Sequence, residues 1–274
     1  MITAPALRVG TFNVRWDAPD DQHRWDQRRA RFVQLLRDWA PDLLGLQEPL
    51  YHQLEQLAEA LPHYTALGVG RDDGKAAGEF CPVLYRTARF DRNDSGTFWL
   101  SDTPNVPGST GWGNCIPRIC TWACLRDCET GAELSLYNVH LDHESQPARE
   151  KSVLLIMDTL RQRTSKGPII VMGDFNVEPG DAALRPLQAK GSPALVSALG
   201  AMHPSPPGTF HEFTGHASGG PIDHIFLSPD WHILEASVLT GDGSRPFPSD
   251  HFPVAATVRL EREPQTMPPG AVAP

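Results

Sequence analysis

Short apolar segments that end in, or are followed by, a polar and chemically reactive side chain recur along most of this sequence. The segments have the length and composition of β-strands, and the side chains beside them carry carboxylate, imidazole or amide groups. These side chains are Asn13, Glu48, His140, Asp174, Asn176, Asp223, Asp250 and His251. One polar residue at a strand end is most simply a turn former. These eight residues lie at six strand boundaries, and six such sites with this chemistry are typical of an acid-lined, metal-binding site for a phosphoester.

The rest of the pattern predicts more strands than helices. Helical spacing of apolar residues predicts helices over His23–Trp39, Tyr51–Leu61 and Gln146–Arg163. Strands are expected at residues 7–14, 43–48, 64–69, 80–85, 90–100, 119–126, 133–140, 168–172, 222–227, 232–239 and 254–260. Several strands follow one another as hairpins, and helices separate groups of strands. The pattern therefore favours an α/β (α+β) fold of two mixed sheets packed face to face, with helices outside.

No linker or internal repeat divides the chain, so we expect one domain over residues 1–261. Residues 262–274 are rich in proline and are expected to form a disordered tail. The first predicted helix carries five arginines that we interpret as a solvated surface: Arg24, Arg28, Arg29, Arg31 and Arg37.

The charge balance limits the partners that this chain can bind. Its 274 residues contain 24 Lys and Arg against 33 Asp and Glu, which gives a formal net charge of −9. This charge argues against a broad basic surface for long nucleic acid, although a local basic patch remains compatible with it. No apolar run approaches the roughly 18 residues of a membrane span, and the start lacks the layout of a signal peptide. We therefore expect a cytoplasmic monomer with no obligate protein partner.

Several residues outside these strand ends allow more than one interpretation. The five cysteines are odd in number and form no C-x-x-C pair, so buried thiols are favoured over a metal cluster. The histidines and acids at positions 142–144, 203, 211 and 216 are interpreted as loop residues. Trp112 lies in a loop and could stack on a substrate or pack within the loop. The motifs G-x-S-x-G and G-x-x-x-x-G-K-[ST] are absent, which argues against a serine hydrolase and a P-loop protein.

Six short strings occur in a fixed order in the sequence: T-F-N-V-R at Asn13, L-Q-E at Glu48, N-V-H-L-D-H at His140, G-D-F-N at Asp174, I-D-H-I-F at Asp223 and S-D-H-F-P-V at Asp250. Together they resemble the endonuclease/exonuclease/phosphatase superfamily of metal-dependent phosphoesterases, over residues 7–260. The resemblance implies a four-layer α/β sandwich. It also implies that the substrate can be a nucleic acid, a nucleotide, an inositol phosphate or a phospholipid head group.

The resemblance assigns roles to these residues. Glu48 would be the principal ligand of Mg²⁺ or Mn²⁺, supported by Asn13 and Asp250. Asp174, helped by Asn176, would orient or deprotonate the attacking water. His251 and His140 would bind phosphate oxygens. Asp223 would fix the tautomer of His251 and raise its pKa by its charge.

Two further positions match the deoxyribonuclease-like members of this superfamily. By this match, Glu79 would pair with His140, and Arg118 would contact the substrate phosphate. These two residues favour hydrolysis of a phosphodiester in a nucleic acid or nucleotide by in-line attack of water. A small-molecule phosphatase or phosphodiesterase is the alternative. A non-catalytic binding module is disfavoured, because all of the core site residues are retained.

Overall fold

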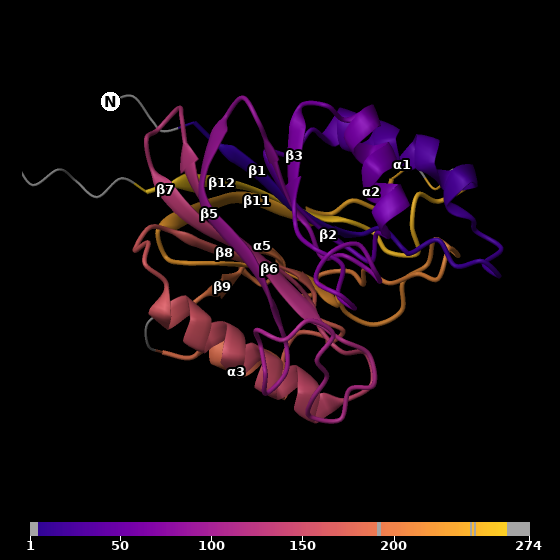
Figure 1. The fold of residues 1–274 in the computed structure, drawn as a ribbon. Helices are drawn as coiled ribbons and strands as arrows, with labels where there is room; N and C mark the ends of the chain where they lie inside the picture. Colours follow the sequence, from indigo (N-terminus) through magenta and orange to yellow (C-terminus); the bar gives the residue numbers. More distant parts are fainter. Residues whose placement is uncertain (1–4, 191–192, 242, 244, 262–274) are drawn as a thin grey trace, which may run out of the picture.

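Two six-stranded mixed sheets lie face to face at the centre of the computed structural model (Figure 1). The structure describes residues 5–190, 193–241, 243 and 245–261, so the expected tail at 262–274 lies outside the described residues. The first sheet has the order β11 (Trp231–Val238), β12 (Val254–Leu260), β1 (Leu7–Asn13), β2 (Leu43–Gln47), β4 (Val83–Arg86) and β3 (Tyr64–Leu67). The second has the order β5 (Phe90–Trp99), β6 (Ile119–Asp127), β7 (Glu133–His140), β8 (Ile169–Asp174), β10 (Asp223–Leu227) and β9 (Val196–Ser197).

Helices cover the outer faces of both sheets. These helices are α1 (Trp25–Trp39), α2 (Tyr51–Ala60) and α3 (Gln146–Gln162), with the shorter η1 (Ala182–Leu184) and α4 (Arg185–Gln188). The short α5 (Ala198–Met202) instead contributes Ala198 and Leu199 to the apolar cluster between the sheets. Apolar residues of α1 and α2 pack on the outer face of β1, β2 and β4, and those of α3 pack on the outer face of β7 and β8. A third apolar cluster fills the space between the sheets. The four-layer α/β sandwich expected from the sequence is therefore confirmed.

Each sheet has one parallel pair of strands at its centre. β1 runs parallel to β2, and α1 forms the connection between them; β7 runs parallel to β8, and α3 connects them. The register pairs Asn13 with Gln47 in the first sheet and His140 with Asp174 in the second. Parallel strands end at the same edge of a sheet. The polar residues that terminate these four strands are thereby brought to one end of the sandwich.

Asn138 ties the two sheets together close to that end. Its side chain is fully buried in β7, and its Nδ2 donates to the carbonyls of Leu46 at 2.7 Å and Pro82 at 2.8 Å. Its Oδ1 accepts from Gln47 Nε2 at 2.7 Å. A Cβ at Gly45 would lie 2.5 Å from this oxygen, so glycine gives the amide its space. All three contacts reach across to the first sheet or its flanking loop.

The sequence pattern places most elements within a few residues of their observed bounds. The predicted helix over His23–Trp39 begins at Trp25, and the strand expected from residue 80 begins at Val83. One surface assignment is wrong: Arg28 is only 1% exposed. It lies three residues after Trp25 and four before Phe32, which is the buried face of the helix. In the described part of the chain, no helix is both long enough and apolar enough to cross a membrane.

Replacing Asn138 by leucine, which has a similar volume, should lower the free energy of unfolding by about 3 kcal/mol. The change removes the donor to the carbonyls of Leu46 and Pro82 and the acceptor of the Gln47 amide, although Pro82 O keeps the N–H of Leu46 and Gln47 Nε2 keeps Thr11 Oγ1. A buried polar group that loses its partner costs about 1–3 kcal/mol. Urea unfolding followed by fluorescence measures the difference. Asn93→Leu is the matched control, because Asn93 is exposed in the same sheet. An equal loss of stability in both variants would contradict the role given to Asn138.

Candidate active site

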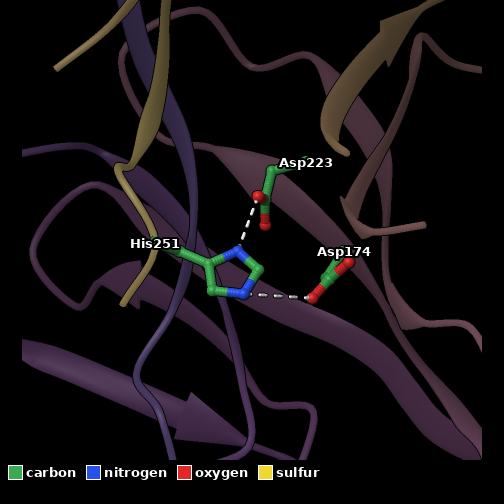
Figure 2. A group of neighbouring side chains, drawn as sticks. All are labelled: Asp174, Asp223 and His251. Carbon is green, nitrogen blue, oxygen red and sulfur yellow. Dashed lines mark hydrogen bonds and ion pairs between the residues drawn. The ribbon is translucent and has the colours of Figure 1, made fainter. Parts of the chain in front are cut away.

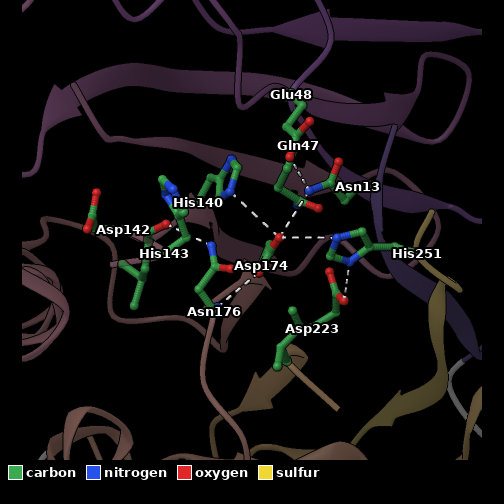
Figure 3. Close-up of polar contacts among 12 residues, drawn as sticks. Asn13, Gln47, Glu48, His140, Asp142, His143, Asp174, Asn176, Asp223 and His251 are labelled. Atoms are coloured by element: carbon green, nitrogen blue, oxygen red, sulfur yellow. Dashed lines mark hydrogen bonds and ion pairs between the residues drawn. The ribbon is translucent and has the colours of Figure 1, made fainter. Parts of the chain in front are cut away.

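The strand ends meet at a pocket of about 630 Å³ between the two sheets. Its polar lining comes from both sheets and from the loops that follow their strands (Figure 3). The polar and charged residues that line it are Arg15, Glu48, Arg71, Asp72, Glu79, Arg118, His140, His143, Asp174, Asn176, Asp250 and His251. Asn13 and Asp223 are fully buried and contact these lining residues from within the protein.

Three residues of this pocket have backbone conformations that are unfavourable for L-amino acids. The φ angle is 61° at Arg15, 71° at Glu48 and 52° at Asn176. Residues other than glycine rarely adopt this left-handed region, and strain of this kind gathers at functional sites. At Glu48 the turn directly after β2 points the carboxylate into the pocket, where Trp16 N donates to Oε2 at 3.1 Å.

Asn13 joins two carboxylates that come from different sheets. Its Nδ2 donates to Glu48 Oε1 at 2.8 Å and to Asp174 Oδ2 at 3.0 Å. Its Oδ1 accepts from the backbone N–H of Arg15 at 2.9 Å, which fixes the orientation of the amide. In this arrangement the Asn13 oxygen faces away from the carboxylates. Asn13 therefore fixes the position of the Glu48 carboxylate, while its own oxygen is engaged by the backbone.

Asp174 lies at the centre of the polar cluster. Besides the bond from Asn13, its Oδ1 accepts from Asn176 N at 2.9 Å, while Asn176 Nδ2 donates to the carbonyl of Leu141. Its Oδ2 is 3.6 Å from His140 Nε2 and 3.9 Å from His251 Nε2. Burial and then the negative charge of Asp223 raise the pKa of Asp174 to about 7. This carboxylate is thus a stronger base than an ordinary aspartate.

His251 and Asp223 form a buried pair beside Asp174 (Figure 2). His251 Nδ1 lies 2.8 Å from Asp223 Oδ2, and the two side chains are almost fully enclosed. Burial alone would lower the pKa of His251, but the charge and hydrogen bond of Asp223 outweigh it and raise the pKa to about 10. The imidazole is therefore protonated, with Nε2 directed toward Asp174.

His140 is held in the opposite state. Burial and the positive charge of Arg118 keep the pKa of His140 well below its ordinary value, so this imidazole is neutral. Its Nε2 accepts from Arg118 Nη1 at 3.1 Å, and His143 Nδ1 accepts from Arg118 Nη2 at 2.8 Å. Asp142 Oδ2 lies 3.6 Å from Arg118 Nε. The pocket thus contains one charged and one neutral imidazole on either side of Asp174.

The expected pairing of Glu79 with His140 is wrong in this structure. Glu79 Oε2 instead accepts from Arg71 Nη1 at 2.6 Å, and the backbone N–H of Arg71 also donates to the carbonyl of Glu79. The turn between these residues brings the arginine against the carboxylate, and His140 is bonded to Arg118. Burial and the charge of Glu48 raise the pKa of Glu79 to about 7. Glu79 therefore lines the pocket as expected, but its partner is Arg71 and not His140.

The oxygen-rich side of the pocket fits a hard divalent cation. Glu48, Asp174 and Asp250 present carboxylates there, and burial together with the charge of Glu48 raises the pKa of Asp250. Carboxylates that destabilise each other in this way are relieved by a cation such as Mg²⁺ or Mn²⁺. Asp174, Asp223 and His251 also cluster closely enough to hold an ion. However, the His251 and Asp223 atoms there are already hydrogen-bonded to each other, so Glu48 and Asp250 fit the cation better.

Several residues in and around the pocket are not identified by the sequence patterns, and Asp142 and Arg71 are two of them. Asp142 is expected in a loop, but it is 3% exposed beside Arg118. Its place two residues after His140 in the same string is the signal that could have identified it. Arg71 lies eight residues before its partner Glu79, a spacing without a recognisable motif.

The structure also decides the roles of Trp112 and the cysteines. Trp112 packs on its own loop, because its Nε1 donates to Asp102 Oδ1 at 2.7 Å. The cysteines are all free thiols, and none joins a metal-type cluster among the described residues. Only Cys81 and Cys120 are buried as expected, whereas Cys115 and Cys128 are exposed. Neither the tryptophan nor the thiols therefore add a group to the pocket.

Several solved structures share this fold. An endonuclease/exonuclease/phosphatase structure from Bacteroides vulgatus is 34% identical, with a TM-score of 0.87, and covers 94% of this chain and 100% of that chain. A mannosyl-6-phosphatase from Bacteroides thetaiotaomicron is 36% identical, with a TM-score of 0.86 and coverage of 93% and 100%. The human Nocturnin catalytic domain is 20% identical, with a TM-score of 0.74 and coverage of 95% and 97%, and shares the fold.

An uncharacterised protein of Acanthamoeba polyphaga mimivirus is 29% identical over 164 residues. The match takes in 57% of this chain and spans about 60% of the length of that relative. The model of the endonuclease/exonuclease/phosphatase family matches residues 10–251 of the chain. Because the family model matches most of the sequence and the two-sheet fold is shared, the protein belongs to the endonuclease/exonuclease/phosphatase family.

Proposed function

We propose that the protein is a divalent-metal-dependent phosphoesterase that hydrolyses its substrate by in-line attack of water, without a covalent intermediate. The observation that carries this proposal is the position of Asp174, which lies between two imidazoles and is joined through Asn13 to the carboxylate of Glu48. A phosphoryl group in this pocket would be next to a base, a charged donor and an oxygen-lined cation site.

Each side chain has a task in this proposal. Asp174 accepts the proton of the attacking water, and its raised pKa favours that transfer near neutral pH. Protonated His251, kept in place by Asp223, donates from Nε2 to a phosphoryl oxygen. Arg118 binds the phosphate on the other side of the pocket, and neutral His140, which accepts from Arg118 Nη1, holds the guanidinium in place.

Glu48 and Asp250 would hold the cation, with Asn13 fixing Glu48. A bound Mg²⁺ or Mn²⁺ would supply Lewis-acid polarisation of the phosphoryl oxygens and offset the charge that develops in the transition state. The left-handed turn at Glu48 keeps its carboxylate oriented into the pocket without any rearrangement on binding.

The substrate that we propose is the phosphomonoester of a small, hydroxyl-rich molecule such as a sugar. The sequence favours a nucleic-acid phosphodiester partly because Glu79 is expected to pair with His140, and that pairing is absent. Two of the three arginines that line the pocket are already engaged with carboxylates, since Arg15 is 3.2 Å from Asp21 and Arg71 is 2.6 Å from Glu79.

Little positive charge is therefore left for the several phosphates of a nucleic acid. Together with the net charge of −9, this favours a substrate with a single phosphate. The similarity to a mannosyl-6-phosphatase over almost the whole chain supports the same class of substrate.

Glu48→Gln should lower kcat by at least about 100-fold, because the amide keeps the shape but removes the charge that holds the cation. Steady-state rates at increasing Mn²⁺ concentration, alongside chelator-treated samples, measure the effect. Glu55→Gln is the control, because Glu55 is exposed on α2 and should retain full activity. Wild-type activity that survives complete chelation would refute metal dependence.

Sugar 6-phosphates should be hydrolysed with a kcat/KM at least about 100-fold above that for bis-p-nitrophenyl phosphate, DNA or RNA. The reason is that the positive charge of the pocket can balance the negative charge of one phosphate but not that of a chain of phosphates. Phosphate release and gel assays under identical metal conditions provide the comparison. Preferred cleavage of DNA, RNA or the diester would reject the monoester and restore the nuclease hypothesis.

A further inference from the structure

Arg28 is a buried cation that lies behind the site and belongs to no catalytic motif. It projects from α1, and its side chain is fully enclosed although the helix is otherwise rich in exposed arginines. Its guanidinium lies 5.1 Å from the ring centre of Trp25 and 5.8 Å from that of Phe213. Its position on the apolar face of α1 directs it toward the loops at the end of the sheets.

The guanidinium binds main-chain carbonyls from three separate segments. Nε donates to His23 O at 2.9 Å, and Nη1 donates to Pro248 O at 3.0 Å. Further hydrogen bonds run to the carbonyls of Val14 and Arg15. A planar guanidinium can donate in several fixed directions at once, which the ammonium group of lysine cannot do with the same geometry.

These carbonyls belong to the two segments that carry the residues of the proposed cation site. Val14 and Arg15 directly follow Asn13, which orients Glu48. Pro248 precedes Ser249, Asp250 and His251. A second tie joins the same two segments, since Ser249 Oγ donates to Asn13 O at 2.6 Å. Arg28 thus connects the segment that fixes Glu48 to the segment that carries Asp250.

We propose that Arg28 is a positioning residue, which holds the segment after Asn13 and the segment before Asp250 at the separation that binds the divalent cation. This inference rests on the proposed metal dependence of the enzyme. Arg28 touches neither the substrate nor the cation in this proposal. It acts through the backbone of both segments, so its loss changes the geometry of ligands that it does not contact.

The electrostatics of the buried guanidinium are consistent with this role. Burial lowers the pKa of Arg28 to about 10, with the charge of Asp250 acting in the opposite direction, so the side chain is still protonated at neutral pH. The carbonyl bonds remain charge-assisted at that pH. Removing the guanidinium would take a donor from the carbonyls of Val14, His23 and Pro248, while the carbonyl of Arg15 would keep Gln53 Nε2.

Arg28→Lys and Arg28→Met test the proposal, with Arg29→Met as the matched control because Arg29 is exposed on the same helix. Mn²⁺ binding to the purified proteins is measured by electron paramagnetic resonance without substrate, and thermal unfolding is followed in parallel. We expect Arg28→Lys to bind Mn²⁺ at least about 10-fold more weakly while still folded, and Arg29→Met to bind like the wild type. At saturating metal, KM should change by less than about twofold.

A folded Arg28→Lys variant with wild-type affinity for Mn²⁺ would overturn the inference, because a purely structural role lowers the melting temperature without changing the affinity of folded molecules. If neither Arg28 variant folds, Ser249→Ala decides: weaker Mn²⁺ binding supports the proposal, and unchanged binding overturns it. A wild-type protein that binds no Mn²⁺ would instead reject the proposed metal dependence and, with it, the premise of this inference.

Discussion

The double hydrogen bond of the Asn13 amide is the contact on which the geometry of the site depends. One neutral nitrogen donates to Glu48 from the first sheet and to Asp174 from the second, so two carboxylates are held close in a buried place. Like charges in such surroundings repel strongly unless donors or cations compensate them. In the proposed mechanism, the amide would hold the carboxylate that binds the cation and the carboxylate that acts as base at a fixed separation.

That contact can form only because the sheets deliver both carboxylates to the same end of the sandwich. The parallel pairs β1–β2 and β7–β8 end there, and Asn138, two residues before the end of β7, joins the sheets through two carbonyls of the facing sheet and its loop. Beyond the strands, the chain adopts the left-handed turns at Arg15, Glu48 and Asn176. The stable packing between the sheets supplies the free energy that keeps these local conformations in place.

The fold and the core of the site can be predicted from the sequence because both are encoded locally. An apolar run followed by Glu48 or Asp174 is visible within a few residues. That these residues meet in one site is implied by the resemblance of the six strings to the superfamily. The burial of Arg28 escapes a prediction based on charge, although its spacing from Trp25 and Phe32 places it on the buried face of the helix. The partner of Glu79 escapes prediction for a different reason: a resemblance between positions does not specify which cation a turn brings to a carboxylate, and here the turn brings Arg71. Contacts of this kind are decided by tertiary packing, and no local pattern contains them.

The most direct test of the proposed site is the anomalous diffraction of manganese in crystals of the wild-type protein. We predict a single strong peak within coordination distance of the Glu48 carboxylate, on the side of the pocket that Asp250 shares. A peak between Asp174, Asp223 and His251 with none at Glu48 would contradict the proposed site, because His251 could not then be the protonated donor to the phosphoryl oxygen.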